Sequence, residues 1–156
     1  MAVQTRSEST VATVPPYRWF EGGGSDRLLD RLAYRRVHAW KALLAKRGLQ
    51  VEIIREAAGT VVRLEGRLDG QSAPVLKEGF QEVMSMGSSF IEVDLGGVSR
   101  IDGVGLAALV WAWRLAQEVG GHLRLARLQP QIREIAARIG LNSLLEITEK
   151  EPLVTP

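Results

Sequence analysis

The stretch Arg100–Trp113, RIDGVGLAALVWAW, joins two patterns at a single turn. Asp102 follows a short apolar strand pattern, two glycines come next within three positions, and a long apolar run with helical spacing follows. These residues predict a strand, a turn, and a helix over residues 104–119 that ends at Gly120-Gly121. Glycines ahead of a helix can cradle a phosphate, let the chain turn, or stand where a reactive side chain would be.

The segment GGVSRIDGVG, residues 96–105, lacks the two best-known phosphate-binding patterns. A Walker loop needs a Lys-Ser or Lys-Thr pair after its glycines, and none follows here. The glycine spacing also differs from that of a dinucleotide-binding turn. Phosphate binding by backbone amides at the start of the helix stays open on physical grounds.

Outward from this stretch, strand patterns alternate with helix patterns. Two strands, residues 51–56 and 60–68, predict a hairpin, and a helix pattern covers residues 71–86. Further strands and helices follow in turn at residues 89–95, 104–119, 122–128, 130–140 and 144–148. The order ββαβαβαβ predicts an α/β fold with a mostly parallel sheet of four to five strands.

Composition limits the classes of protein to consider. The chain has 156 residues, of which 46% are hydrophobic and 24% charged, as in an ordinary globular protein. It has no cysteine, which excludes disulfides, a thiol nucleophile and thiolate metal sites. No apolar run reaches the roughly 20 residues needed to cross a bilayer, and the first residues lack a signal-peptide centre, so we expect a cytoplasmic protein.

The charge and the glycines divide the chain into four segments. We expect a disordered tail over residues 1–24, a basic amphipathic helix over 25–48, one domain over 49–150 and a short tail over 151–156. Seven of the residues from Arg27 to Arg47 are basic and only Asp30 is acidic. An apolar stripe on the same helix comprises Leu29, Ala33, Val37, Trp40 and Leu44.

This stripe has several explanations. Packing on the following domain or on a second copy of the helix is favoured, and binding to an anionic membrane surface is the alternative. Nucleic acid is disfavoured because the helix carries charge without a recognisable DNA-binding or RNA-binding motif.

The residues that could support catalysis are few. His38 and His122 are far apart in sequence and lack carboxylates at metal-ligand spacing, so we predict no metal site and no cofactor. Asp69 and Asp102 each follow a strand, where open α/β sheets gather their functional loops. Because no nucleophile or base accompanies them, the sequence does not support an enzyme, and we assign no catalytic residue.

Four motifs resemble the STAS domain, the sulfate-transporter and anti-sigma-factor-antagonist fold. They are LEGRLDGQSAPVL at 64–76, FIEVDLGGVSRIDGVGLAAL at 90–109, GGHLRLARLQPQI at 120–132 and RIGLNSLLEI at 138–147. They occur in the order and spacing of the family, and the resemblance covers about Val51 to Lys150. It implies a STAS fold and a non-enzymatic module for protein–protein interaction in signal transduction and transcription regulation.

In bacterial anti-sigma factor antagonists of this family, the turn reads Asp-Ser-Ser-Gly or Asp-Ser-Thr-Gly. The first hydroxyl after the aspartate is phosphorylated by a kinase that doubles as the anti-sigma factor, and the added charge releases that partner. Asp102 and Gly105 match this pattern, whereas Gly103 replaces the phospho-acceptor and Val104 the second hydroxyl. The resemblance therefore implies an antagonist that is non-phosphorylatable at this position.

The same resemblance implies a docking surface. We expect it to comprise Asp69, Arg100, Asp102, Gly103, Val104, Gly105, Leu106 and Trp111. Its partner would be an anti-sigma factor of the kinase-like type. Two alternatives are an accessory subunit that clamps the ATPase of a lipid-transport ABC complex and a STAS module that binds a nucleotide.

Helical spacing divides the apolar run after the turn into two faces. We expect one face to pack on the sheet: Leu106, Leu109, Val110, Trp113 and Ala116. The other would form an outer stripe: Val104, Ala108, Trp111, Leu115 and Val119. Such a stripe predicts a partner surface, unless the N-terminal helix or the aromatic residues Tyr17, Trp19 and Phe20 cover it; self-association as a homodimer is a third alternative.

Overall fold

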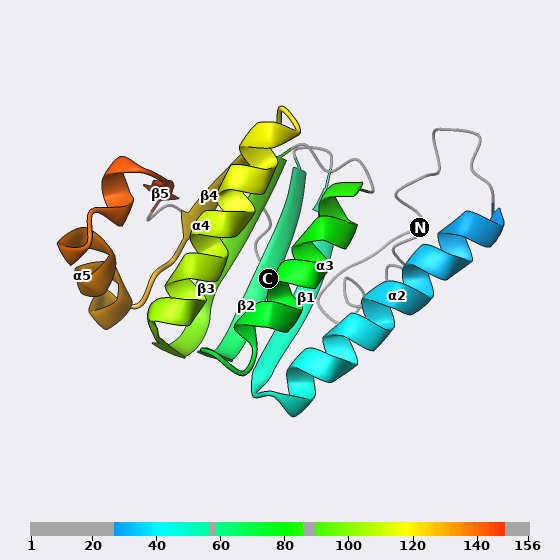
Figure 1. Cartoon of the computed structure of the whole chain (residues 1–156), viewed down its shortest axis with the longest axis horizontal. Helices are drawn as coiled ribbons and strands as arrows, with labels where there is room; N and C mark the ends of the chain where they lie inside the picture. The colour runs from blue at the N-terminus through cyan, green and yellow to red at the C-terminus, as the bar shows by residue number, and fades with distance from the viewer. Residues whose placement is uncertain (1–26, 57–58, 86–89, 149–156) are drawn as a thin grey trace.

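The fold is an α/β domain, which the helix α2 precedes in the described part of the chain (Figure 1). The computed structural model describes residues 27–56, 59–85 and 90–148. The elements in chain order are α2 (Arg27–Lys46), β1 (Leu49–Glu56), β2 (Gly59–Leu68), α3 (Ala73–Ser85), β3 (Phe90–Ile101), α4 (Gly103–Glu118), β4 (His122–Ala126), α5 (Pro130–Arg138), the 3₁₀ turn η2 (Leu141–Ser143) and β5 (Glu146–Thr148).

One five-stranded sheet, with the strands in the order β1-β2-β3-β4-β5, forms the centre of the domain. β1 and β2 are antiparallel, and the remaining three pairs are parallel. This arrangement confirms the α/β prediction and the order ββαβαβαβ. Several element boundaries differ by a few residues. β3 continues to Ile101 instead of ending at 95, and α5 ends at Arg138 instead of 140. α3 begins at Ala73, two residues later than expected, because the two residues before it belong to a turn that closes on Asp69.

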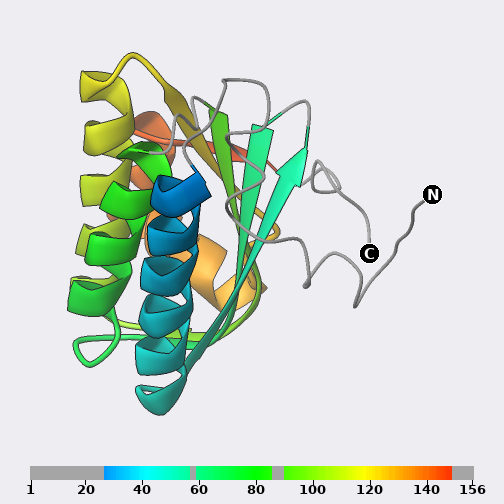
Figure 2. The same cartoon turned by 90° about the vertical axis from the view of Figure 1, so that its right-hand side faces the viewer.

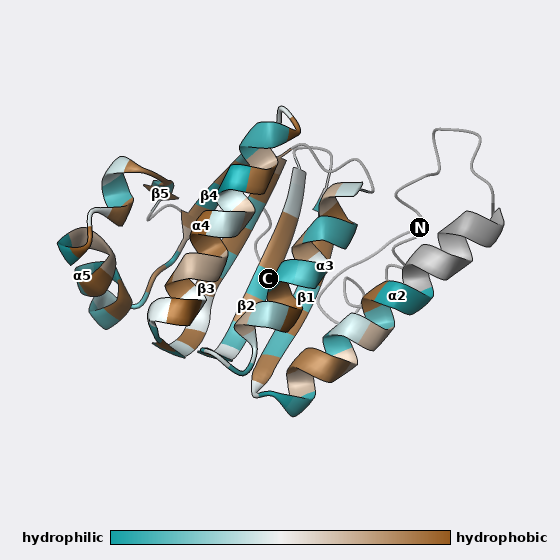
Figure 3. Cartoon of the chain, viewed as in Figure 1, coloured by the Kyte–Doolittle hydropathy of each residue, from teal (hydrophilic) through white to brown (hydrophobic). Residues whose placement is uncertain are grey.

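The helices α2, α3 and α4 lie on the same face of the sheet (Figure 2). The core fills the space between them and the strands, and its fully buried side chains include Phe80, Leu64, Leu95 and Leu109. Toward the viewer, α3 shows mainly hydrophilic turns, whereas α4 also shows hydrophobic ones (Figure 3). Burial of this continuous apolar layer is the main force that holds the helices on the sheet.

The opposite face of the sheet carries charged side chains that pair across strands. Asp94 is fully buried and accepts hydrogen bonds from Arg63 Nε at 3.2 Å and Arg127 Nε at 3.1 Å. Glu92 is also fully buried and accepts from Arg124 Nε at 2.8 Å. These partners offset the desolvation of the two carboxylates.

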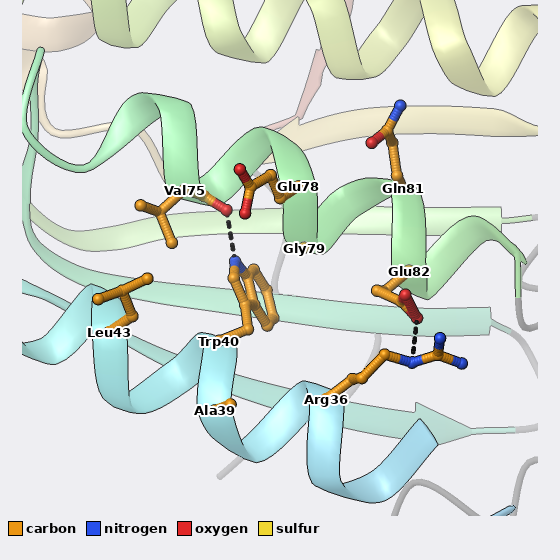
Figure 4. A pocket seen from close by; sticks show the side chains of 9 residues that line it. All are labelled: Arg36, Ala39, Trp40, Leu43, Val75, Glu78, Gly79, Gln81 and Glu82. Atoms are coloured by element: carbon orange, nitrogen blue, oxygen red, sulfur yellow. Dashed lines mark hydrogen bonds and ion pairs between the residues drawn. The ribbon is translucent and has the colours of Figure 1, made fainter. Parts of the chain in front are cut away.

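The described part of α2 packs on α3 and β1. Its buried side chains are Val37, Trp40 and Leu44, whereas the side chains of Leu29 and Ala33 lie outside the described set. The indole of Trp40 lies against Gly79, and its Nε1 donates to the carbonyl oxygen of Val75 at 2.7 Å (Figure 4). The described stripe thus packs on the domain of its own chain.

Two other expectations concern the ends of the chain and the membrane. The expected tails, residues 1–24 and 151–156, lie outside the described residues, as do Tyr17, Trp19 and Phe20. Among the described helices, none combines the length and the apolar character that spanning a bilayer requires.

Candidate functional site

The turn between β3 and α4 is built around Asp102. Asp102 has extended backbone geometry and is the N-cap residue of α4. Its Oδ1 accepts a hydrogen bond from the backbone N–H of Gly105 at 2.9 Å, which satisfies one of the free donors in the first helical turn. The negative charge also lies at the positive end of the helix dipole. Asp102 therefore has a structural role in addition to the predicted docking role.

The same side chain connects this turn to the loop between β2 and α3. Asp102 Oδ2 accepts from the backbone N–H of Gly70 at 3.2 Å. The backbone N–H of Asp102 in turn donates to the carbonyl oxygen of Leu68 at 3.3 Å. The structure thus brings the two aspartate loops together at the carboxyl ends of β2 and β3, as expected from a parallel sheet.

Asp69 organises its own loop. Its Oδ1 accepts from the backbone N–H groups of Gln71, at 3.0 Å, and Ser72, at 3.3 Å. The fully buried Ser72 hydroxyl donates to the carbonyl oxygen of Arg67 at 2.9 Å and accepts from the N–H of Asp69 at 3.1 Å. Ser72 is a site residue that the sequence patterns did not single out, although an aspartate three residues before a serine is a known turn pattern.

The two glycines of the turn occupy different environments. A Cβ on Gly105 would overlap the carbonyl oxygen of Leu68, so the start of α4 approaches the end of β2 too closely for any side chain. A Cβ on Gly103 would have no neighbouring atom within 4 Å. Gly103 is exposed and its φ lies outside the left-handed region, so neither space nor backbone conformation requires a glycine here.

The predicted docking residues are not equally accessible. Arg100, Asp102, Gly103 and Val104 are exposed, with Val104 at 51%. Gly105 and Leu106 are buried, and Leu106 is only 7% exposed because it belongs to the core under α4. Little of the Leu106 side chain is therefore open to a partner, and its docking role stays a prediction.

The predicted division of α4 into two faces was correct for the buried residues Leu106, Leu109 and Ala116 and wrong for three others. The buried face is lined mainly by small residues: Gly105, Leu106, Ala108, Leu109, Ala112 and Ala116. Ala108, expected on the outer stripe, is 1% exposed, while Val110 and Trp113, expected on the sheet, are only partly buried. Small side chains let α4 approach its neighbours closely. The prediction gave most weight to large apolar residues, so it placed the buried face at the wrong angle around the helix and missed the buried alanines.

Trp111 lies in a partly covered position. Its side chain is half-buried, and the Lys77 ammonium of α3 lies 5.1 Å from the centre of its ring. This geometry is that of a cation–π contact. α3 lies between α2 and α4 (Figures 1 and 2), and the described part of α2 packs on α3 and β1. The apolar positions of the outer stripe that stay open are its two ends, Val104 and Val119.

The site combines exposed polar groups with a fixed backbone. Within residues 27–56, 59–85 and 90–148, no group of three or more histidine and carboxylate side chains is placed to hold a metal ion. The two carboxylates of the site accept hydrogen bonds from backbone amides. This arrangement can present a rigid surface to another protein.

A sequence profile described as "Mlab, STAS domain" matches residues 51–146. The Anti-sigma-B factor antagonist of Bacillus subtilis (strain 168) is 26% identical over 102 residues, which are 65% of this chain and 93% of that protein.

Two solved structures have the same fold. An anti-sigma factor antagonist from Mycobacterium paratuberculosis superposes with a TM-score of 0.60 at 19% identity, covering 67% of this chain and 88% of its own. The Bacillus cell fate determinant SpoIIAA in its phosphorylated form superposes with a TM-score of 0.52 at 20% identity, covering 65% and 92%.

Proposed function

The chain belongs to the STAS domain family, and from this premise we propose that it is a non-enzymatic docking module that resembles an anti-sigma factor antagonist. Its partner is an anti-sigma factor of the kinase-like type. The complex is not released by phosphorylation at the β3–α4 turn, because residue 103 has no hydroxyl.

The environment of Gly103 is the observation that carries this proposal. A relative with the same fold, SpoIIAA, exists in a phosphorylated form. Here the position after the N-cap aspartate is exposed and has room for a side chain, yet it carries none. A phosphate adds nearly two negative charges. Without a phospho-acceptor at residue 103, the charge of the predicted docking surface does not change at this position.

The test compares the wild-type chain with Gly103→Ser. Each protein is incubated with a histidine-kinase-like ATPase domain that it retains on a column, with and without ATP, and is then weighed intact. We expect phosphate on the serine variant only, together with ATP-dependent loss of its complex. Phosphate on the wild-type peptide from Arg100 to Leu106 would contradict the proposal.

A second candidate is an accessory subunit that remains bound to the ATPase of a lipid-transport ABC complex. The missing hydroxyl also favours this role, because a permanently assembled subunit needs no release by phosphate. Copurification separates the two candidates: a transporter-type ATPase supports the second, and a histidine-kinase-like ATPase supports the first.

A further inference from the structure

Four basic side chains gather at the edge of the sheet where the candidate site lies. They are Lys46 and Arg47 at the end of α2, Arg67 near the end of β2, and Arg100 near the end of β3. We call this set the basic edge. Arg67 and Arg100 are direct neighbours in the parallel β2–β3 register. All four thus lie at the end of the domain that also carries Gly103. The last turn of α2 therefore contributes to the basic edge.

Backbone and side-chain contacts connect the end of α2 to the site. Gly48 turns the chain from α2 into β1 with a φ of 90°, and its carbonyl oxygen accepts from the N–H of Arg67 at 2.9 Å. A Cβ on Gly48 would overlap the Arg67 guanidinium, so that side chain lies across the turn. Arg47 Nη1 donates to the carbonyl oxygen of Gln71 at 3.0 Å, inside the Asp69 loop.

The basic edge is only partly neutralised within the chain. Lys46 and Arg100 are exposed, and neither forms an ion pair with a described residue. The Arg67 side chain is 53% exposed, and its Nε lies 4.0 Å from Asp69 Oδ2, the longest of the ion pairs here. Four like charges on one edge repel one another and favour a ligand of opposite charge.

The two acidic residues of the edge are turned toward backbone amides. Asp69 accepts from Gln71 and Ser72, and Asp102 accepts from Gly70 and Gly105, at the start of two helices. The helix dipoles offset part of their charge. With four basic and two acidic side chains, this edge keeps an excess of positive charge.

We propose that the basic edge is part of the docking surface and that the partner presents an acidic protein surface to it. This inference rests on the proposed function and adds the chemistry of the partner. An acidic protein fits better than an anionic membrane because Val37, Trp40 and Leu44 of α2 are buried against the domain. Among the described side chains of α2, the large apolar one that stays exposed is Leu43, at 40%, and a single side chain is a weak anchor in lipid. Complementary charge would chiefly accelerate association.

The experiment uses the full chain and two double variants with the same change in charge. The first, Lys46→Glu with Arg100→Glu, reverses two exposed residues of the basic edge. The matched control, Arg35→Glu with Arg114→Glu, reverses two exposed residues elsewhere on α2 and α4. Thermal unfolding of all three proteins verifies that the variants are folded.

The probe is the histidine-kinase-like ATPase domain that the wild-type chain retains. The readout is the rate constant for association of this domain with each of the three proteins, at low and at physiological ionic strength. We expect a loss of at least about tenfold for the basic-edge variant at low salt, with little change for the control. A carbodiimide, which joins an amine to a carboxylate as an amide with loss of water, should couple Lys46 to a partner Asp or Glu.

Several results would overturn the inference while the proposed function stands. One is retention of the ATPase with equal rates for wild type and the basic-edge variant, or with equal losses for both variants. Another is carbodiimide coupling at Lys41 or Lys77 with none at Lys46. Binding to phosphatidylglycerol vesicles that the basic-edge variant loses would assign the edge to a membrane. If wild type retains no such ATPase, the proposed function fails and this inference with it.

Discussion

The α2–α3 junction and the β3–α4 turn each contain a glycine, Gly79 and Gly103, and the two glycines differ in what surrounds them. At the junction, a Cβ on Gly79 would overlap the indole of Trp40, which is 7% exposed. At the turn, a Cβ on Gly103 would meet no atom within 4 Å. The first glycine is required by packing, and the second is not.

This difference lets substitutions that change the stability of the fold be told apart from substitutions that change only the exposed surface. Where a glycine makes room for a neighbour, its replacement should change the free energy of unfolding, and the reason is local packing. Where a glycine lies in open space, its replacement should leave folding intact and change only what the surface presents. Four predictions test this distinction, from the largest expected effect to the smallest.

The largest expected losses of stability come from substitutions at the contact between Gly79 and Trp40, and Gly79→Ala tests its packing directly. The added methyl group overlaps Trp40, and overpacking of this kind costs about 1–3 kcal/mol, with loss of the Trp40 Nε1 bond to Val75 as a further cost. Trp40→Ala alone should cost about 3–5 kcal/mol. Because the clash disappears without the indole, the double variant should be much less unstable than the sum of the two. Urea unfolding measures all three.

The control for this prediction is Glu78→Ala, the neighbouring exposed position on α3, which should change stability by no more than about 0.5 kcal/mol. Strict additivity of Gly79→Ala and Trp40→Ala would show that the two residues do not share the site.

Gly105→Ala should cost about 1–3 kcal/mol, because its Cβ overlaps the carbonyl oxygen of Leu68. Gly103→Ala, two residues earlier in the same turn, should change the free energy of unfolding by less than about 0.5 kcal/mol. Calorimetry of the two variants compares two glycines within a single turn. Equal losses of unfolding free energy for Gly105→Ala and Gly103→Ala would refute the prediction.

Asp102→Ala should cost about 1 kcal/mol through loss of the N-cap, and it should also release the loop at Gly70. Asp102→Asn keeps an accepting oxygen and should recover most of that stability. Hydrogen exchange at the amides of Gly70 and Gly105 should rise in the alanine variant. Unchanged exchange at Gly70 would mean that the carboxylate does not hold the two loops together.

Gly103→Ser should have the smallest effect on folding, within about 0.5 kcal/mol, since the side chain enters open space. The thermal midpoint and the urea midpoint both report on it. A loss as large as that of Gly105→Ala would mean that the turn itself requires glycine at this position.

Sequence patterns were sufficient for the order of elements and for the meeting of two loops at one edge. Alternating strand and helix patterns, with Asp69 and Asp102 each after a strand, predict this because parallel strands place their carboxyl ends together. The partner, and the docking role of the exposed residues, stay predictions. Which face of α4 is buried was not predictable from large apolar residues, because Ala108, Ala112 and Ala116 make the close contacts.

The sequence by itself therefore determined the α/β order, the position of the β3–α4 turn and the absence of a hydroxyl at residue 103. Only the tertiary structure decided that Gly79 accommodates Trp40, that Gly103 has free space, and that Arg47 reaches Gln71. Periodicity along the chain records which residues share a face of one element. Contacts between elements far apart in the chain depend on packing distances that no local pattern encodes.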